Sequence, residues 1–209
     1  MKHPALSTLT CLAAIASTGI SAQTHQDDAH YQGPYIAADI SFMNDFKVKA
    51  FGYEDSGDAD ESYNIRVGYD VDINMGPQVL LGVEVEYRDL GEFSERYSND
   101  SLTATGDGVS FNLRPKFYFD NAPIYVAGIV GFGRYDLKTT YAEYDSSRNQ
   151  YDIDSLRKRE NAWQFGGELG TSINDRIDVA VSYRVVKFDI DKHVDIDARG
   201  LTVGVAYRL

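Results

Sequence analysis

Two carboxylates, Glu84 and Glu86, stand one residue apart and are the first candidates for chemistry in this chain. A pair of this kind can divide the roles of general acid and general base. Arg114 and Lys116 follow on a later segment with the same spacing of two, which places each pair on one face of a β-strand. Mutual neutralisation of the two pairs is therefore the simpler expectation.

The histidines offer little support for catalysis. His193 stands between Asp191 and Asp195, which could orient an imidazole, but no serine lies near it in sequence to act as the nucleophile. His25 and His30 fall in a polar stretch close to the N-terminus. We expect neither an enzyme nor a bound cofactor.

Acidic runs are the other group with chemical potential, one at residues 54–61 and one at residues 189–197. Their carboxylate oxygens could bind Ca²⁺ or Mg²⁺, which also bridge anionic surfaces, so contact with lipopolysaccharide follows as a hypothesis. The spacing lacks the glycine and distal glutamate of an EF-hand loop, and a solvated acidic surface is the simpler interpretation. The calcium candidates of the second run are Asp189, Asp191, Asp195 and Asp197.

The segments that carry these residues alternate with a period of two. In residues 200–209, Leu201, Val203, Val205, Tyr207 and Leu209 share one face, and small, polar or charged residues share the other. The same pattern recurs with Arg, Glu and Asp on the second face, which is typical of a membrane barrel with apolar residues outward. Strands are predicted at residues 35–43, 63–71, 79–87, 109–119, 124–137, 162–173, from 177 onward, and 200–209.

Two of these strands carry irregularities. Pro115 cannot donate to a ladder, so we expect a bulge or a strained pairing there. The strand at residues 124–137 is ambiguous, because Arg134 and Asp136 favour even positions inward whereas Val126 and Val130 favour them outward. Residues 174–175 are predicted to form a two-residue turn.

Connections between the predicted strands alternate between long polar segments and short turns. Outer-membrane barrels have long outer loops and short periplasmic turns, so this order predicts both termini on the short-turn side. The last strand would then pair with the first. The predicted fold is all-β, an eight-stranded antiparallel up-and-down transmembrane β-barrel.

The lumen of such a barrel is only wide enough for side chains to fill. An unpaired charge there would cost several kcal/mol, so the inward ionisable residues should form an ion-pair network that plugs the barrel. A narrow gate or a small conductance is the alternative. The predicted network consists of Asp39, Arg66, Asp70, Glu84, Glu86, Arg88, Arg114, Lys116, Glu168, Asp178, Arg184 and Arg208.

The N-terminus predicts export. A short basic start, a weakly apolar run and a small residue at Ala22 indicate a signal peptide over residues 1–22, which includes the single cysteine, Cys11. A polar leader would follow at residues 23–32 and the barrel domain at residues 33–209. The net charge of −12 argues against a nucleic-acid partner.

With these residues in view, the chain resembles the small eight-stranded outer-membrane barrels of the OmpA/OmpX type, the outer membrane protein beta-barrel domain family. Residues 123–135 and the C-terminal strand carry most of the resemblance, which covers residues 33–209. The resemblance implies an assembly signal at Thr202, Gly204, Tyr207 and Leu209, where the family usually ends in Phe or Trp instead of Leu.

The resemblance and the residues together predict a non-enzymatic, monomeric protein of the Gram-negative outer membrane, serving envelope integrity or surface interaction. Expected partners are outer-membrane lipid, lipopolysaccharide, the outer-membrane assembly machinery and a surface or host ligand. A narrow porin-like channel is the second hypothesis. A soluble ligand-carrying barrel is the third, but its apolar lumen conflicts with the inward Arg and Glu residues.

Overall fold

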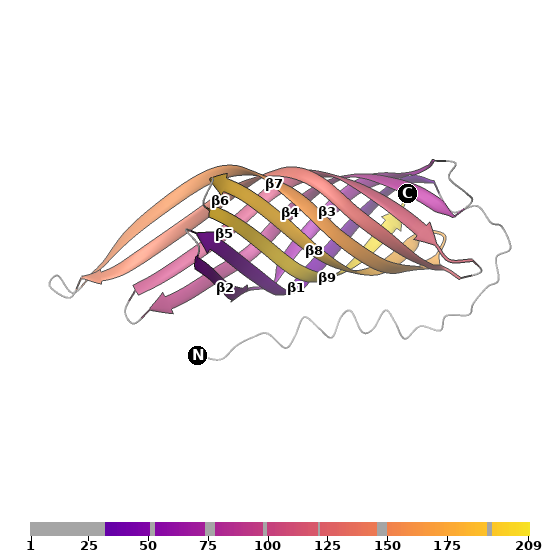
Figure 1. Ribbon diagram of the computed structural model, residues 1–209. Helices are drawn as coiled ribbons and strands as arrows, with labels where there is room; N and C mark the ends of the chain where they lie inside the picture. The colour runs from indigo at the N-terminus through magenta and orange to yellow at the C-terminus, as the bar shows by residue number, and fades with distance from the viewer. Residues whose placement is uncertain are drawn as a thin grey trace, which may run out of the picture.

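The computed structural model describes residues 32–50, 53–73, 78–97, 100–120, 122–145, 150–191 and 194–209, which form one antiparallel sheet closed into a barrel (Figure 1). The strands from β3 to β9 pair in chain order, β1 pairs with both β2 and β3, and β1 also pairs with β9, which closes the ring. The predicted all-β, antiparallel barrel is confirmed. The strands are β1 (Gly33–Ala50), β2 (Tyr53–Ala59), β3 (Ser62–Asp72), β4 (Val79–Tyr97), β5 (Asp100–Tyr118), β6 (Ile124–Asp145), β7 (Gln150–Asn174), β8 (Ile177–Asp191) and β9 (Val194–Arg208).

The nine segments correspond to eight strands of the barrel wall, because β2 and β3 are two parts of one strand. Both pair with β1, and their register continues unchanged from Ala50↔Tyr53 to Gly33↔Asp70. The interruption at residues 60–61 lies beside irregularities in both neighbouring strands. Met43 of β1 has a φ of 55° and Gly91 of β4 a φ of 80°, and each sits at a shift in register.

The long polar segments are hairpins, which corrects the prediction of loops there. The β6–β7 ladder continues to Asp145↔Gln150, and the β4–β5 ladder continues to Tyr97↔Asp100. Polarity was a misleading signal, because a strand outside a membrane needs no apolar face when cross-strand hydrogen bonds satisfy its backbone. We call this the hairpin end of the barrel and the opposite end, with its short connections, the turn end.

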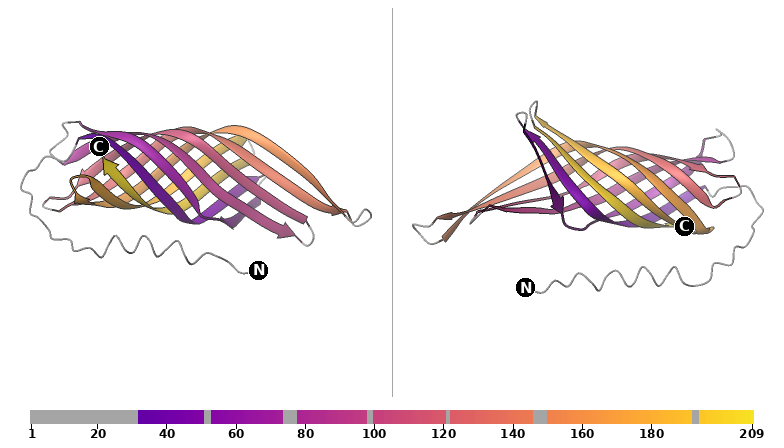
Figure 2. Two further views of the ribbon diagram at one scale, coloured as in Figure 1. Left: turned by 180° about the vertical axis from the view of Figure 1, so that it is seen from behind. Right: turned by 60° about the horizontal axis from the view of Figure 1, so that its bottom comes forward.

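The hairpins project in different directions. β7 pairs with β8 only from Ala162↔Phe188 onward, and β2 meets β4 at a single pair, Ala59↔Phe93. In the right-hand view of Figure 2, the indigo β1–β2 and yellow β8–β9 hairpins point away from the orange β6–β7 hairpin.

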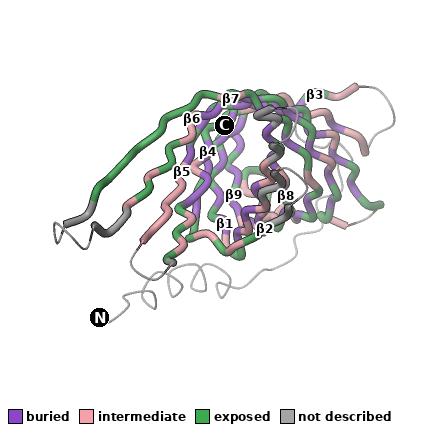
Figure 3. The backbone as a smooth tube through the Cα atoms, turned by 60° about the vertical axis from the view of Figure 1, so that its left-hand side comes forward, coloured by how far each residue is buried: buried purple, intermediate pink, exposed green. Residues whose placement is uncertain are grey.

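Successive residues of each strand face alternately into and out of the barrel, as Figure 3 shows in its repeated change between buried and exposed residues. Exposed apolar side chains form a band around the outside, among them Ile65, Val85, Phe111, Phe165 and Val205. Within this band the inward residues are mostly polar or charged, the arrangement of a transmembrane barrel.

The arrangement of apolar residues outward and polar residues inward is inverted toward the hairpin end. On β8 the outward residues change from Val181 and Tyr183 to Lys187, while the inward residues change from Arg184 to Val186 and Phe188. Inward side chains here build an apolar cluster like the core of a soluble barrel. The hairpin-end cluster consists of Phe46, Leu90, Tyr135, Ala162, Val186, Phe188 and Ala198.

The structure shows how β6 and β5, the two strands with irregular sequences, are arranged. On β6 the odd residues Tyr125, Ala127 and Ile129 face inward, so Arg134 faces outward and the even-inward alternative is wrong. Of the bulge or strained pairing expected at Pro115, the bulge is absent: the β5–β6 ladder is interrupted at residues 114–115 and resumes in the same register.

The turn between β7 and β8 is shifted by one residue from its predicted place, to Asp175 and Arg176. The side chain of Asn174 accepts hydrogen bonds from the backbone N–H groups of Arg176 and Ile177, both at 2.9 Å, and so begins the turn. The described N-terminal and C-terminal ends, Gln32 and Leu209, lie at the same end of the barrel. No helix in the described ranges is long and apolar enough to span a membrane.

Candidate functional site

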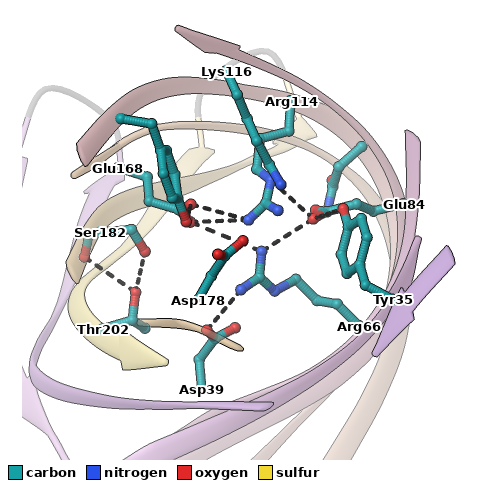
Figure 4. Close-up of polar contacts among 12 residues, drawn as sticks. Tyr35, Asp39, Arg66, Glu84, Arg114, Lys116, Glu168, Asp178, Ser182 and Thr202 are labelled. Carbon is teal, nitrogen blue, oxygen red and sulfur yellow. Dashed lines mark hydrogen bonds and ion pairs between the residues drawn. The ribbon is translucent and has the colours of Figure 1, made fainter. Parts of the chain in front are cut away.

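The barrel interior holds all twelve ionisable residues predicted to face inward. None is more than 7% exposed, and the set contains six carboxylates and six cations. They come from seven strands around the ring, β1, β3, β4, β5, β7, β8 and β9. Figure 4 shows the central part of this interior, where side chains from different strands converge.

The centre is a chain of two guanidinium groups and three carboxylates. Arg66 pairs with Asp39 at 2.8 Å and with Glu84 at 3.1 Å. Arg114 pairs with Glu84 at 3.1 Å and with Glu168 at 3.0 Å. Because β1, β3, β4, β5 and β7 each supply one member, the bonds extend across the lumen as well as along its wall (Figure 4).

Two tyrosines complete the coordination of these carboxylates. The hydroxyl of Tyr35 donates to Glu84 at 2.5 Å, and that of Tyr125 donates to Glu168 at 3.0 Å. Their rings also lie 5.0 and 5.6 Å from the ammonium of Lys116, within the range of cation–π attraction. Sequence reasoning selected only ionisable residues and missed both tyrosines, although Tyr35 shares the parity of Asp39 along its strand.

Glycines on neighbouring strands make room for these rings. A Cβ atom on Gly68 would lie 2.5 Å from the ring of Tyr35, and one on Gly170 would lie 2.3 Å from that of Tyr125. Both separations are shorter than van der Waals contact. The tyrosines can therefore reach the carboxylates only because these two positions carry no side chain.

Toward the turn end, two further ion pairs lie in the interior. The ammonium of Lys116 contacts the carboxylate of Asp70, and Arg208 donates to both oxygens of Asp178 at 2.6 Å. Ser172 donates to the same Asp178 at 2.7 Å. Leu80, Tyr118, Tyr125 and Ala127 form a second apolar cluster in this region.

Toward the hairpin end, Glu86 is the only one of the six carboxylates in contact with Arg88 and Arg184. It accepts from Arg88 at 2.7 Å and from Arg184, and also from the amides of Asn112 and Gln164, both at 3.3 Å. Glu86 is fully buried. Glu84 and Glu86 are thus each held by two guanidinium groups, an arrangement that neutralises them and leaves neither free as an acid or base.

The predicted metal candidates are only partly visible. The side chains of Asp189, Asp191 and Asp195 lie outside the described residues, as does His193. Asp197 pairs with Arg199 at 2.7 Å. Within the described ranges, no group of three or more His, Cys, Asp or Glu residues could hold a metal ion.

The residues of the predicted assembly signal alternate in facing along β9. Thr202 is buried and exchanges a hydrogen bond with Ser182, and Gly204 faces Asp39. Tyr207 and Leu209 are exposed on the outer surface at the turn end.

Comparison with known structures shows the same kind of barrel. Similar structures include Ail, the attachment invasion locus protein of Yersinia pestis, in complex with the heparin analogue sucrose octasulfate (17% identity, 85% of this chain and 99% of that chain, TM-score 0.48). Neisserial surface protein A (14%, 85% and 97%, 0.45) and the outer membrane protease OmpT from Escherichia coli (9%, 84% and 97%, 0.51) are also similar. At these identities the likeness concerns the fold alone.

No curated protein matches the chain. The family model of the outer membrane protein beta-barrel domain, however, matches residues 11–208, which include every described strand. The chain belongs to the outer membrane protein beta-barrel domain family.

Proposed function

We propose that this chain is a closed, non-enzymatic barrel of the Gram-negative outer membrane, exported by its signal peptide, that serves envelope integrity and presents surface hairpins to partners. Family membership implies the outer-membrane location. The filled lumen is the observation that supports the proposal most strongly, because it argues against both a pore and an internal catalytic site.

The lumen is closed by three layers. The ion pairs of Arg66 and Arg114 occupy the middle, and an apolar cluster lies on either side of them. A conducting path would require separation of buried ion pairs, and breaking one such pair costs about 3–5 kcal/mol. This favours a plug over the alternative of a narrow porin-like channel.

Planar-bilayer recording tests the proposal. The refolded protein should give no steady single-channel current. The control is the double variant Arg114→Ala/Glu168→Ala, which removes both partners of one lumen-crossing pair and should increase leak current. A steady conductance from the unaltered protein would instead support the channel hypothesis.

The β6–β7 hairpin is the best surface for a partner. Residues 150–161 of β7 pair with β6 but not with β8, so within the described ranges one edge of this strand has no strand beside it. Ile153 and Leu156 are each 67% exposed on it. An extended peptide can add to such an edge through main-chain hydrogen bonds. Adhesion of expressing cells to plates coated with extracellular-matrix proteins should fall when the hairpin is shortened.

Lipopolysaccharide contact is favoured by a basic patch on the outer face of the same hairpin. Four cations, Arg134, Lys138, Arg157 and Arg159, lie on two paired strands around two carboxylates, Asp136 and its exposed cross-strand partner Asp107 on β5. Arg159 donates to Asp136 at 2.8 Å and holds the pKa of that carboxyl below its ordinary value. The remaining positive charge suits lipid phosphate groups.

The basic patch also lies at a suitable height for contact with lipid phosphate groups. The edge-to-face pair Phe132 and Trp163 belongs to the apolar band, and Arg134 follows two residues later on the same face. Binding of the refolded barrel to vesicles of phosphorylated lipid A, compared with dephosphorylated lipid A, tests this contact. Equal binding to both would contradict it.

Recognition by the assembly machinery and a monomeric state complete the proposal. Closure through β1 and β9 supports a monomer, because the described band of the barrel has no free strand edge. Thr202, Gly204, Tyr207 and Leu209 are the proposed assembly signal.

A further inference from the structure

A pocket lies inside the barrel where the charged interior meets the hairpin-end cluster. The cavity has a volume of about 20 Å³, which is room for one water-sized group. Its lining combines guanidinium, amide and hydroxyl groups with apolar side chains. The residues that matter here are Arg88, Arg184, Asn44, Ser62, Phe46 and Val186.

Positive charge exceeds negative charge at this pocket. Arg88 and Arg184 both bind Glu86, so two guanidinium groups share one carboxylate. The next carboxylates, Asp39 and Glu84, are bound to Arg66, and Glu84 is also bound to Arg114. The twelve interior residues balance in charge, so the excess is local: Arg88 and Arg184 line the pocket, and no carboxylate among the described residues does.

Glu86 has no capacity left for a further donor. A carboxylate offers about four acceptor positions, and Glu86 already accepts from Arg88, Arg184, Asn112 and Gln164. In agreement, the Nη2 atom of Arg184 is buried and has no hydrogen-bond partner among the described residues. A buried guanidinium donor of this kind is costly unless something accepts from it.

Neighbouring polar groups in the pocket lining can also donate. Ser62 accepts a hydrogen bond from Asn44 at 3.4 Å, which leaves its own hydroxyl proton available. Phe46 and Val186 supply the apolar part of the lining and offer no charge to a bound ion.

We propose that this pocket binds a single halide ion, held by Arg88 and Arg184. The halide supplies the acceptor that Arg184 lacks, beside two guanidinium groups that share one carboxylate. The site is independent of the proposed plug, surface and lipid functions, because none of those uses Arg88 or Arg184 as a ligand.

The direct test uses the unaltered protein. Crystals of the refolded barrel are soaked in sodium bromide, and the anomalous difference map is inspected at the pocket. The expected result is a bromide peak in contact with Nη2 of Arg184. A map with only water in the pocket, or with bromide confined to the outer surface, would overturn the proposal.

A solution test separates a halide site from general anion screening. The urea midpoint of unfolding is measured in chloride and in butyrate, which is too large for the cavity, at an ionic strength held constant with a bulky anion. Stabilisation by chloride should rise with the logarithm of its concentration above the dissociation constant. A shift with chloride and none with butyrate supports the site; an equal shift with both, or dependence on ionic strength alone, contradicts it.

Variants assign the effect to the pocket. Arg184→Gln should abolish the anion-dependent shift. Lys187→Gln is the matched control, because it removes one positive charge from the same strand at an outward side chain that is 58% exposed. Loss of the shift in both variants would mean surface screening and would overturn the proposal. Should Arg184→Gln fail to fold, the bromide map of the unaltered protein still decides.

Discussion

At the scale of single residues, the interior depends on hydroxyl and amide groups as much as on charges. Glu84 accepts hydrogen bonds from the hydroxyl of Tyr35 and from Arg66 and forms an ion pair with Arg114, all at its Oε1 atom, and Glu86 accepts from two amides. Such neutral donors add to the ion pairs. A buried carboxylate needs donors of this kind because burial removes its contacts with water.

Replacement of the Tyr35 hydroxyl tests this role. Tyr35→Phe removes the 2.5 Å bond to buried Glu84 while keeping the ring over Gly68. We expect a loss of about 1–3 kcal/mol in the free energy of unfolding, because the carboxylate is left with one acceptor position unsatisfied. Urea unfolding in detergent micelles measures it. Tyr63→Phe, at an exposed outward position, is the control and should change stability little; equal losses would contradict the role.

At the scale of strands, alternation predicted most facing correctly because a residue's side of the sheet follows from its parity. It failed on β6, where Gly131 and Gly133 carry no facing signal and Arg134 lies beyond the apolar band, where an outward charge is favourable. It also could not pair residues across the lumen. Arg184 meets Glu86 from 98 positions away, and this depends on the curvature of the sheet rather than on local pattern.

The barrel does not need the full length of the β6–β7 hairpin. Removal of residues 143–152, with an Asn-Gly turn joining Ala142 to Ile153, leaves the rest of the β6–β7 ladder unchanged. Ala142 and Ile153 already pair with each other, so a two-residue turn can join them. We expect the shortened protein to refold with its compact gel mobility unchanged. Loss of the compact form would show that the hairpin contributes to folding of the barrel.

At the scale of the whole molecule, closure by β1 and β9 makes the last strand decisive. Tyr207 pairs with Ile36 on β1 and with Ile177 on β8, so the end of β9 completes the ring. A ring without free edges should remain folded in detergent without heating. The unheated protein should therefore migrate as a compact form that heating converts to a slower one.

Substitution at the C-terminal strand separates assembly from stability. Tyr207→Ala removes an exposed side chain that we assign to the assembly signal, so the amount in the outer-membrane fraction should fall severalfold. The urea midpoint of the refolded variant should change little, because the ring lies on the surface. Immunoblots of membrane fractions measure the first, with Tyr69→Ala, another outward tyrosine, as control. An equal fall in both variants would contradict a signal at Tyr207.

The inversion of facing from the apolar band to the hairpin-end cluster also has a mechanical consequence. A barrel whose outside changes from Tyr183 to Lys187 while its inside changes from Arg184 to Phe188 cannot slide along its axis without burying charge in lipid or wetting its core. The sequence of the chain therefore fixes how deeply the barrel sits in the bilayer. In a bilayer thicker or thinner than the band, the lipid has to adjust its thickness to the protein.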